Sequence, residues 1–135
     1  MLALTRAVWQ EVVAHTYDGL PDEACGLLAG PPGADRAERF YPCRNAAESS
    51  RVYTIDPREH LRADREAEAD GLEIIGVVHS HTHTDAVPSP TDVSQAPDPA
   101  WHYVIVSLRD QAPMLRSWRI AEGTVAEEAV ALAPG

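Results

Sequence analysis

The segment 73–81, with the sequence EIIGVVHSH, constrains the fold of this chain more than any other. Its central residues are apolar and mostly β-branched, and no polar residue interrupts them before His79. Such a continuous run is typical of a strand that is buried on both faces of a sheet. A sheet with a strand of this kind needs a packed layer on each face, so we predict a sheet covered by helices.

Patterns typical of strands and helices recur on both sides of this run. Aromatic and β-branched residues between turn-forming stretches predict further strands at 24–30, 36–43, 51–56, 102–108, 113–120 and, near the C-terminus, 124–132. An amphipathic helix is predicted over 5–18, where the residues spaced for one face are Trp9, Val12, Val13 and Thr16. Glu23 lies where the strand at 24–30 begins.

Two further helices are predicted from the capping residues at their N-termini. Asp56 is placed to cap a helix that runs from Pro57 towards Gly71, and Glu59 completes a pattern similar to a capping box. The stretch 89–92, Ser-Pro-Thr-Asp, is a complete capping box with proline at the first helical position, so it opens a short helix. Strands that alternate with helices in this order predict an α/β or α+β fold, with one mixed sheet flanked by helices.

Length and composition narrow the classes of protein further. The chain has 135 residues, which suits a single domain over 1–135, and a net charge of -10, which opposes binding to nucleic acid. No apolar stretch is long enough to span a membrane. The N-terminus lacks the apolar run of a signal peptide, and only two cysteines are present, Cys25 and Cys43, so we expect free thiols in the cytoplasm.

The chemistry of the chain is concentrated at the end of the central run. His79 and His81 are two residues apart on a strand and therefore point the same way, and Asp92 returns at the start of the next helix. Two imidazoles and one carboxylate leave a fourth position open, which is the arrangement of catalytic rather than structural zinc. A His-x-His pair alone is a weak indication of a metal site.

The pair becomes informative together with Glu23, in the stretch PDEACGLLAG, and with Ser89. The whole set resembles the JAMM (MPN-plus) zinc metalloprotease family, although Thr82 stands where the common motif has proline. The resemblance implies a cytidine-deaminase-like JAMM/MPN fold in which His79, His81 and Asp92 bind Zn2+. It also implies that Glu23 is the catalytic acid–base and that Ser89 stabilises the oxyanion.

The form HSHT…PSPTD is similar to a bacterial subgroup of this family that acts on ubiquitin-like sulfur-carrier proteins. This resemblance implies hydrolysis of the amide bond after a C-terminal Gly-Gly, with release of cysteine or of a C-terminal extension, and so a role in cysteine biosynthesis. The expected partner is the carrier protein. The sequence leaves open whether the chain also forms a homodimer.

Each residue of the set also has a structural interpretation. Ser89 and Asp92 could serve only as a helix cap, and Glu23 could be an exposed charge beside a strand. His83 could be a fourth ligand or a solvated loop residue, and Cys25 could approach the metal or be an inert buried thiol. The alternative function is a non-catalytic MPN-type scaffold that binds proteins, whereas a zinc deaminase is excluded because its Pro-Cys-x-x-Cys motif is missing.

Overall fold

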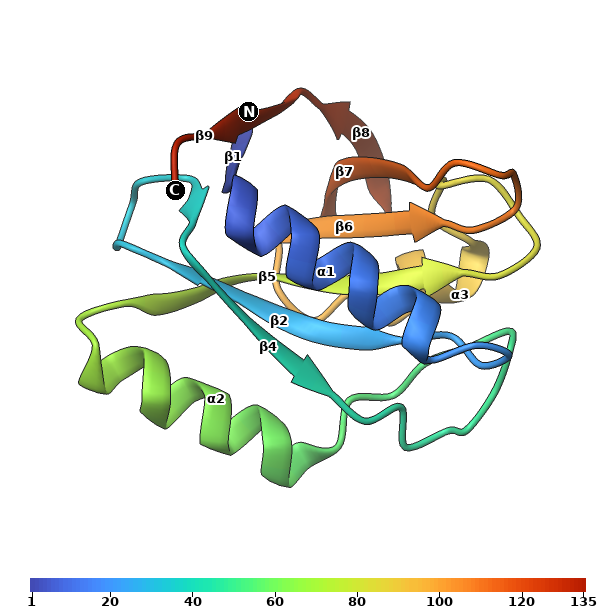
Figure 1. The fold of residues 1–135 in the computed structure, drawn as a ribbon, viewed down its shortest axis with the longest axis horizontal. Helices are drawn as coiled ribbons and strands as arrows, with labels where there is room; N and C mark the ends of the chain where they lie inside the picture. The colour runs from blue at the N-terminus through green and yellow to red at the C-terminus, as the bar shows by residue number, and fades with distance from the viewer.

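The computed structural model describes all residues, 1–135, and is built around a six-stranded mixed sheet in the order β4-β2-β5-β6-β7-β8 (Figure 1). The strands are β2 (Cys25–Gly30), β4 (Arg39–Cys43), β5 (Glu73–His81), β6 (His102–Ser107), β7 (Met114–Ala121) and β8 (Thr124–Glu128). Strands β5 and β6 pair in parallel, and all other neighbours in this sheet are antiparallel. The predicted fold class, a mixed sheet flanked by helices, is confirmed.

Strand β5 has the central place that its sequence predicts. It lies between β2 and β6, and every residue from Ile75 to His81 is buried. Gly76 allows the close approach of β6, because a Cβ atom at this position would lie 2.5 Å from the carbonyl oxygen of His102. The buried run therefore corresponds to a strand covered on both faces.

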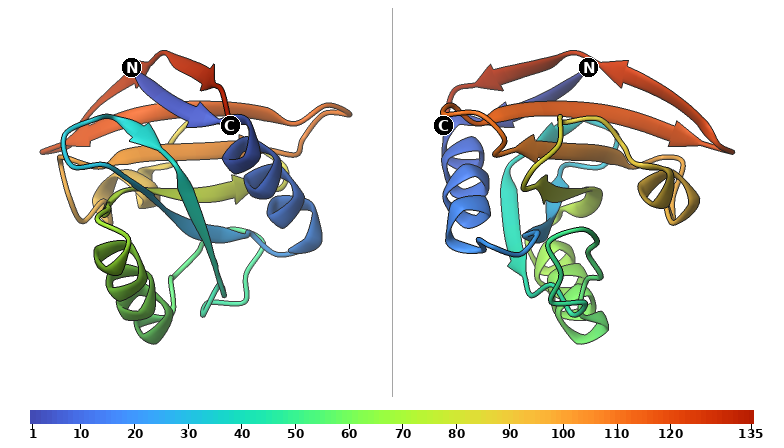
Figure 2. Two further views of the ribbon diagram at one scale, coloured as in Figure 1. Left: turned by 60° about the vertical axis from the view of Figure 1, so that its left-hand side comes forward. Right: turned by 90° about the vertical axis from the view of Figure 1, so that its right-hand side faces the viewer.

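Three helices accompany the sheet, namely α1 (Arg6–Asp18), α2 (Pro57–Ala69) and α3 (Pro90–Ser94). The core is divided into two clusters, one on each face of the sheet. Val8 and Val12 of α1 belong to the first cluster with Val78, whereas Ala63 of α2 belongs to the second cluster with Val77. Figure 2 shows α1 and α2 on different sides of β2 and β4.

The stripe that α1 buries differs from the predicted one. Val8, Val12 and Thr16 are buried, while Trp9 and Val13 are only half-buried. The buried face of α1 is thus centred on Val8 and Val12, and Val8 packs in the same cluster as Leu2 and Leu4.

None of the three helices has the length and hydrophobicity that a membrane-spanning segment needs.

A second, small sheet was not predicted. Its order is β3-β1-β9, formed by β1 (Leu2–Thr5), β3 (Arg36–Ala37) and β9 (Val130–Ala133), and both pairings are parallel. The segments predicted as single strands at 36–43 and 124–132 are therefore each divided between the two sheets. Figure 2 shows the N-terminal strand β1 beside the C-terminal strand β9.

The prediction of a strand at 51–56 was wrong. This segment is irregular, and its only bridge joins Ile55 to Asn45. The side chain of Asn45 forms hydrogen bonds with two backbone groups of this segment that would otherwise pair with a neighbouring strand. Its amide nitrogen donates to the carbonyl of Val52 at 3.0 Å, and its oxygen accepts from the amide of Thr54 at 3.0 Å.

The cap of α2 is also simpler than predicted. Asp56 caps the helix by accepting a hydrogen bond from the amide of Arg58 at 2.9 Å. Glu59 does not return to the cap, because its carboxylate accepts from the amide of Arg44 at 2.7 Å. The carboxylate instead ties α2 to the segment that follows β4.

Candidate metal centre

The C-terminal end of β5 places His79 and His81 on the same face, with both side chains buried. Their positions are held from two sides, because His79 lies opposite Cys25 of β2 and opposite Ile105 of β6 in the sheet register. The two Nε2 atoms lie 3.1 Å apart. The antiparallel strand β2 and the parallel strand β6 thus hold both imidazoles at the C-terminal end of the central strand β5.

Asp92 reaches the same point from the first turn of α3. The capping box is complete: the amide of Ser89 donates to Asp92 Oδ2 at 2.8 Å, and the amide of Asp92 donates to the Ser89 hydroxyl at 3.1 Å. The same Oδ2 atom lies 3.2 Å from Nε2 of His79 and 3.1 Å from Nε2 of His81. The helix cap therefore orients the carboxylate towards the imidazoles, so the structural and functional interpretations of Ser89 and Asp92 are compatible.

The three atoms form a nearly equilateral triangle that fits a metal ion. A tetrahedral zinc ion with bonds of about 2.0–2.1 Å keeps its ligand atoms about 3.3 Å apart, close to the 3.1–3.2 Å observed. Nδ1 of His81 lies 2.8 Å from the carbonyl oxygen of Asp85 and must carry its proton to bond there. This hydrogen bond leaves the Nε2 lone pair of His81 free for a ligand bond.

The charges of the cluster suit a cation. Burial alone would raise the pKa of Asp92, but hydrogen bonds from His79 and His81 outweigh it and hold the pKa well below its usual range. Burial lowers the pKa of His79, which favours the neutral imidazole that metal binding requires. Burial alone would also lower the pKa of His81, but its hydrogen bonds with Asp92 and the carbonyl of Asp85 outweigh burial and raise the pKa, so His81 gives up its Nε2 proton when a metal ion binds.

Glu23 lies immediately before β2 and is buried, with 4% of its surface exposed. The interpretation as an exposed flanking charge is therefore wrong. Its backbone is anchored on both sides, because its amide donates to the carbonyl of Ser49 at 2.8 Å and its carbonyl accepts from the side chain of Asn45 at 2.9 Å. Burial raises the pKa of the Glu23 carboxyl to about 7, an effect that the nearby imidazole of His81 partly offsets.

The carboxylate of Glu23 opens onto a polar cavity of about 480 Å³. None of the residues that line this cavity is hydrophobic, and they include His81 and Ser89. The Oε1 atom of Glu23 is buried and has no hydrogen-bond partner in the protein. A buried carboxylate oxygen of this kind calls for a water molecule or a substrate proton as its partner.

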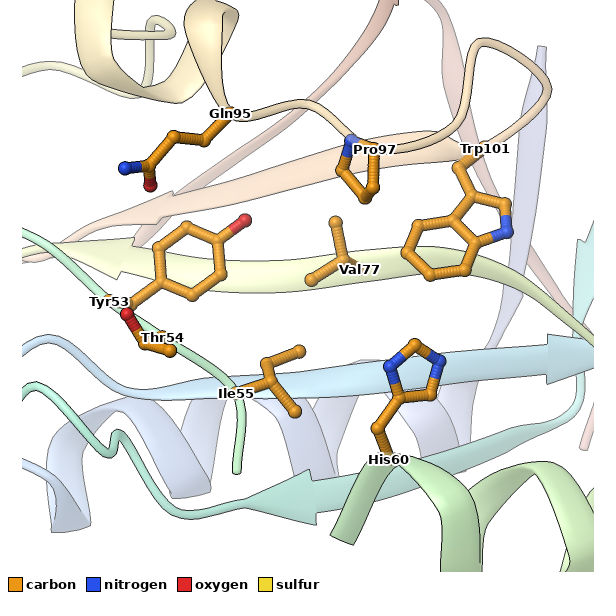
Figure 3. Close-up of a pocket in the computed structure, with 8 residues that line it drawn as sticks. All are labelled: Tyr53, Thr54, Ile55, His60, Val77, Gln95, Pro97 and Trp101. Carbon is orange, nitrogen blue, oxygen red and sulfur yellow. The ribbon is translucent and has the colours of Figure 1, made fainter. Parts of the chain in front are cut away.

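A second cavity, of about 250 Å³, lies against Val77, two residues before His79 on β5, and is largely apolar (Figure 3). Tyr53, Ile55, Val77 and Trp101 are among the residues that line it. The ring of Tyr53 also stacks on the imidazole of His79 and so joins this cavity to the metal-binding cluster. Sequence patterns did not identify Tyr53 as part of the site, because its neighbours carry no motif.

Two open questions about ligands have structural answers. His83 is exposed and lines the polar cavity, and it is not part of the cluster of converging ligand atoms. Cys25 is buried, and its sulfur faces the carbonyl of Cys43 at 3.8 Å. Burial raises the pKa of the Cys25 thiol to about 12, so it is the inert thiol of the two interpretations.

Comparison with known proteins agrees with this geometry. Residues 5–121 match the family of prokaryotic homologs of the JAB domain. A CysO-cysteine peptidase from Mycobacterium tuberculosis is 50% identical over 121 residues, which cover 88% of this chain and 82% of the relative.

Solved structures give the same result for the fold. A solution structure from Desulfitobacterium hafniense has a TM-score of 0.91 at 38% identity and covers all of this chain and 94% of its own. A JAB1/MPN domain protein from Archaeoglobus fulgidus has a TM-score of 0.64 at 17% identity, covering 98% of this chain and 97% of its own, and supports the fold alone. The chain therefore belongs to the prokaryotic JAB-domain family of the JAMM/MPN type, and it is a peptidase of that family.

Proposed function

We propose that this protein is a zinc-dependent peptidase that hydrolyses the amide bond after the Gly-Gly end of a small ubiquitin-like sulfur-carrier protein. One observation carries the proposal: three ligand atoms converge beside a buried carboxylate that has a free oxygen and a pKa of about 7. A metal-binding cluster beside such a carboxylate provides the parts that amide hydrolysis requires.

In this proposal, His79, His81 and Asp92 hold the zinc ion. When bound, zinc supplies Lewis-acid chemistry, since it makes water more acidic and polarises the carbonyl of the amide. The residues contribute geometry, because the β5 strand and the capping box of α3 hold all three ligand atoms in place. Little reorganisation of the protein is then required for binding.

Glu23 is the proposed general base and acid. Its free Oε1 accepts the proton of the attacking water and delivers it to the nitrogen of the leaving amine. A carboxyl group with a pKa near 7 is suited to both transfers at neutral pH, because neither protonation state is strongly disfavoured.

Ser89 is proposed to stabilise the developing oxyanion. Its oxygen accepts the amide proton of Asp92, so the hydroxyl hydrogen remains available to donate towards the cavity. A donor of this kind, fixed by a helix cap, strengthens as negative charge develops on the carbonyl oxygen.

The carrier tail is proposed to lie in the apolar cavity along β5, between Tyr53 and Trp101 (Figure 3). Glycines at the end of the tail would lie beside Tyr53, whose ring covers the imidazole of His79. The relative named CysO-cysteine peptidase supports cysteine as the released group, with a longer C-terminal extension as the alternative. We further propose that residues 1–135 act as one catalytic domain, in the cytoplasm.

A direct assay tests this function against the non-catalytic scaffold. The protein is reconstituted with zinc and incubated with a ubiquitin-like carrier that is extended beyond Gly-Gly, and the mass of the carrier is followed. The expected result is a loss equal to the mass of the extension, and a chelator should prevent it. Binding of the carrier without any change in its mass would favour the scaffold.

A further inference from the structure

The two cavities follow one another along the direction of β5. The apolar cavity lies against Val77, the ligands follow at His79 and His81, and the polar cavity is formed partly by the next residues, 82–84. A substrate that crosses the cluster along this line therefore has one part in each cavity.

The position of the proton donor indicates which of the two cavities holds the leaving group of the substrate. If Glu23 acts as proposed above, it must reach the nitrogen of the leaving amine, and Glu23 lines the polar cavity but not the apolar one. The polar cavity is accordingly the site of the leaving group, and this step depends on the proposed function.

Arg51 gives the polar cavity a positive charge. It is an exposed arginine that lines this cavity, and its guanidinium makes no ion pair or hydrogen bond with the protein. Five other arginines each lie within 4 Å of a carboxylate, namely Arg36, Arg44, Arg58, Arg109 and Arg116. Five further arginines also lack a carboxylate within 4 Å, so Arg51 is distinguished from them by its position, because it lines the same cavity as Glu23.

The loop that carries Arg51 is joined to the site at two points, through the carbonyl groups of Ser49 and Ser50. The amide of Arg51 donates to the Ser49 hydroxyl at 3.0 Å, and the carbonyl of Ser49 accepts from the amide of Glu23. The neighbouring carbonyl of Ser50 accepts from the hydroxyl of Thr82 at 3.2 Å. The backbone of this arginine is therefore held in place relative to Glu23 and to the end of β5.

We propose that Arg51 binds the free α-carboxylate of a single C-terminal amino acid, which is the leaving group. An amino acid joined to the carrier through its α-amine has its carboxylate one carbon from the scissile nitrogen, on the leaving side. A guanidinium pairs with a carboxylate through two parallel hydrogen bonds, which fixes both position and charge. A lysine side chain joined to the carrier through its ε-amine lacks this carboxylate, so Arg51 selects carrier–amino acid adducts over protein conjugates.

The test compares two substrates that differ in one group. A ubiquitin-like carrier ending in Gly-Gly-Ala is prepared with a free C-terminal carboxylate and, separately, with a C-terminal carboxamide. With the zinc-loaded protein, kcat/KM for the free acid should exceed that for the amide by about tenfold or more, which is typical of a charge-assisted pair. Arg51→Ala should lower cleavage of the acid to the level of the amide and leave the amide unchanged, while Arg51→Lys should keep part of the preference.

The control is Arg65→Ala, an exposed arginine on α2 that lines neither cavity. This variant should behave as wild type towards both substrates. Equal cleavage of acid and amide by wild type, or a preference that survives Arg51→Ala, would overturn the assignment while leaving the proposed function intact. If wild type cleaves neither substrate, the proposed function itself fails, and the role of Arg51 fails with it.

Discussion

The phenol ring of Tyr53 stacks on the imidazole of His79, with ring centroids 4.3 Å apart and an angle of 19° between their planes. His79 is fully enclosed by this contact and by the sheet, since only 2% of its surface is exposed. No group of the protein forms a hydrogen bond with Nδ1 of His79. The stack therefore takes the place of the hydrogen bond that commonly orients a ligand histidine.

We expect Tyr53→Ala to weaken zinc binding by about tenfold or more, the range typical for groups that support metal ligands. Tyr53→Phe keeps the ring and should bind zinc as wild type does. Competition with a chromophoric chelator measures both affinities. An alanine variant that binds zinc as tightly as wild type would show that the sheet alone orients His79.

The ligand assignment predicts about one zinc ion per chain. His79→Ala and His81→Ala each remove one vertex of the ligand triangle and should lose the metal. His83→Ala is the matched control, because His83 is an exposed histidine two residues further along and outside the triangle. Elemental analysis of the purified proteins decides the matter, and wild type that remains metal-free after reconstitution with zinc would contradict the assignment.

Local sequence predicts those parts of the fold whose signals are local. Strand β5 and the start of α2 were predicted correctly, because a buried β-branched run and an Asp-Pro cap act within a few residues. The small sheet could not be predicted in this way, since β1 pairs with β9 at the opposite end of the chain. The same limit explains the error at 51–56, where Asn45 decides the conformation from outside the segment.

The candidate site likewise contains residues that a local sequence motif identifies and residues that only the tertiary structure brings to it. The motif residues from Glu23 to Asp92 could be named from the sequence because their spacing is characteristic of a family. Tyr53 and Arg51 could not, because they lie in an irregular segment and reach the site only through tertiary contacts.

The cysteines should behave as free, unreactive thiols. Cys25 and Cys43 are direct neighbours across β2 and β4, and both are buried and reduced. Burial raises the pKa of each thiol to about 12, which leaves little thiolate at neutral pH. We expect the thermal midpoint to be the same with and without a reducing agent, and native thiol titration to be slow. A large drop in the midpoint on reduction would reveal a structural disulfide.

Glu23 should make the stability of the metal-free protein depend on pH. Its pKa of about 7 in the folded chain exceeds the ordinary value of 4.5, so the folded state binds more protons between these two values. The contribution of the neutral Glu23 carboxyl to the free energy of unfolding is fully present below pH 4.5 and is lost as the pH rises through 7. Glu23→Gln cannot ionise and should gain on the order of 2 kcal/mol over wild type between pH 4.5 and pH 8, after allowance for solvent screening.

Urea unfolding of both metal-free proteins across this pH range provides the measurement. The difference in the free energy of unfolding between wild type and Glu23→Gln is the relevant quantity, because His79, His81 and Asp92 titrate in both proteins. A difference that does not change with pH would show that the carboxyl group is better solvated than its burial indicates.

Glu23→Gln also separates metal binding from catalysis. Glutamine has nearly the same size, and Glu23 is not a vertex of the ligand triangle, so the variant should keep the fold and about one zinc ion per chain. The amide cannot accept and return a proton, and the loss of a general base typically costs 10²–10⁴-fold in rate. Asp92→Ala is the matched comparison, because it removes a ligand and should lose metal and activity together.

The two variants are assayed by the change in mass of a carrier extended beyond Gly-Gly, with zinc content measured on the same samples. A slow, zinc-loaded Glu23→Gln beside a slow, zinc-free Asp92→Ala is the expected pair of results. Cleavage by Glu23→Gln at the wild-type rate would mean that another group moves the proton. Glu23 is then a bystander in the cavity, and the proposed mechanism is wrong even if the zinc site is right.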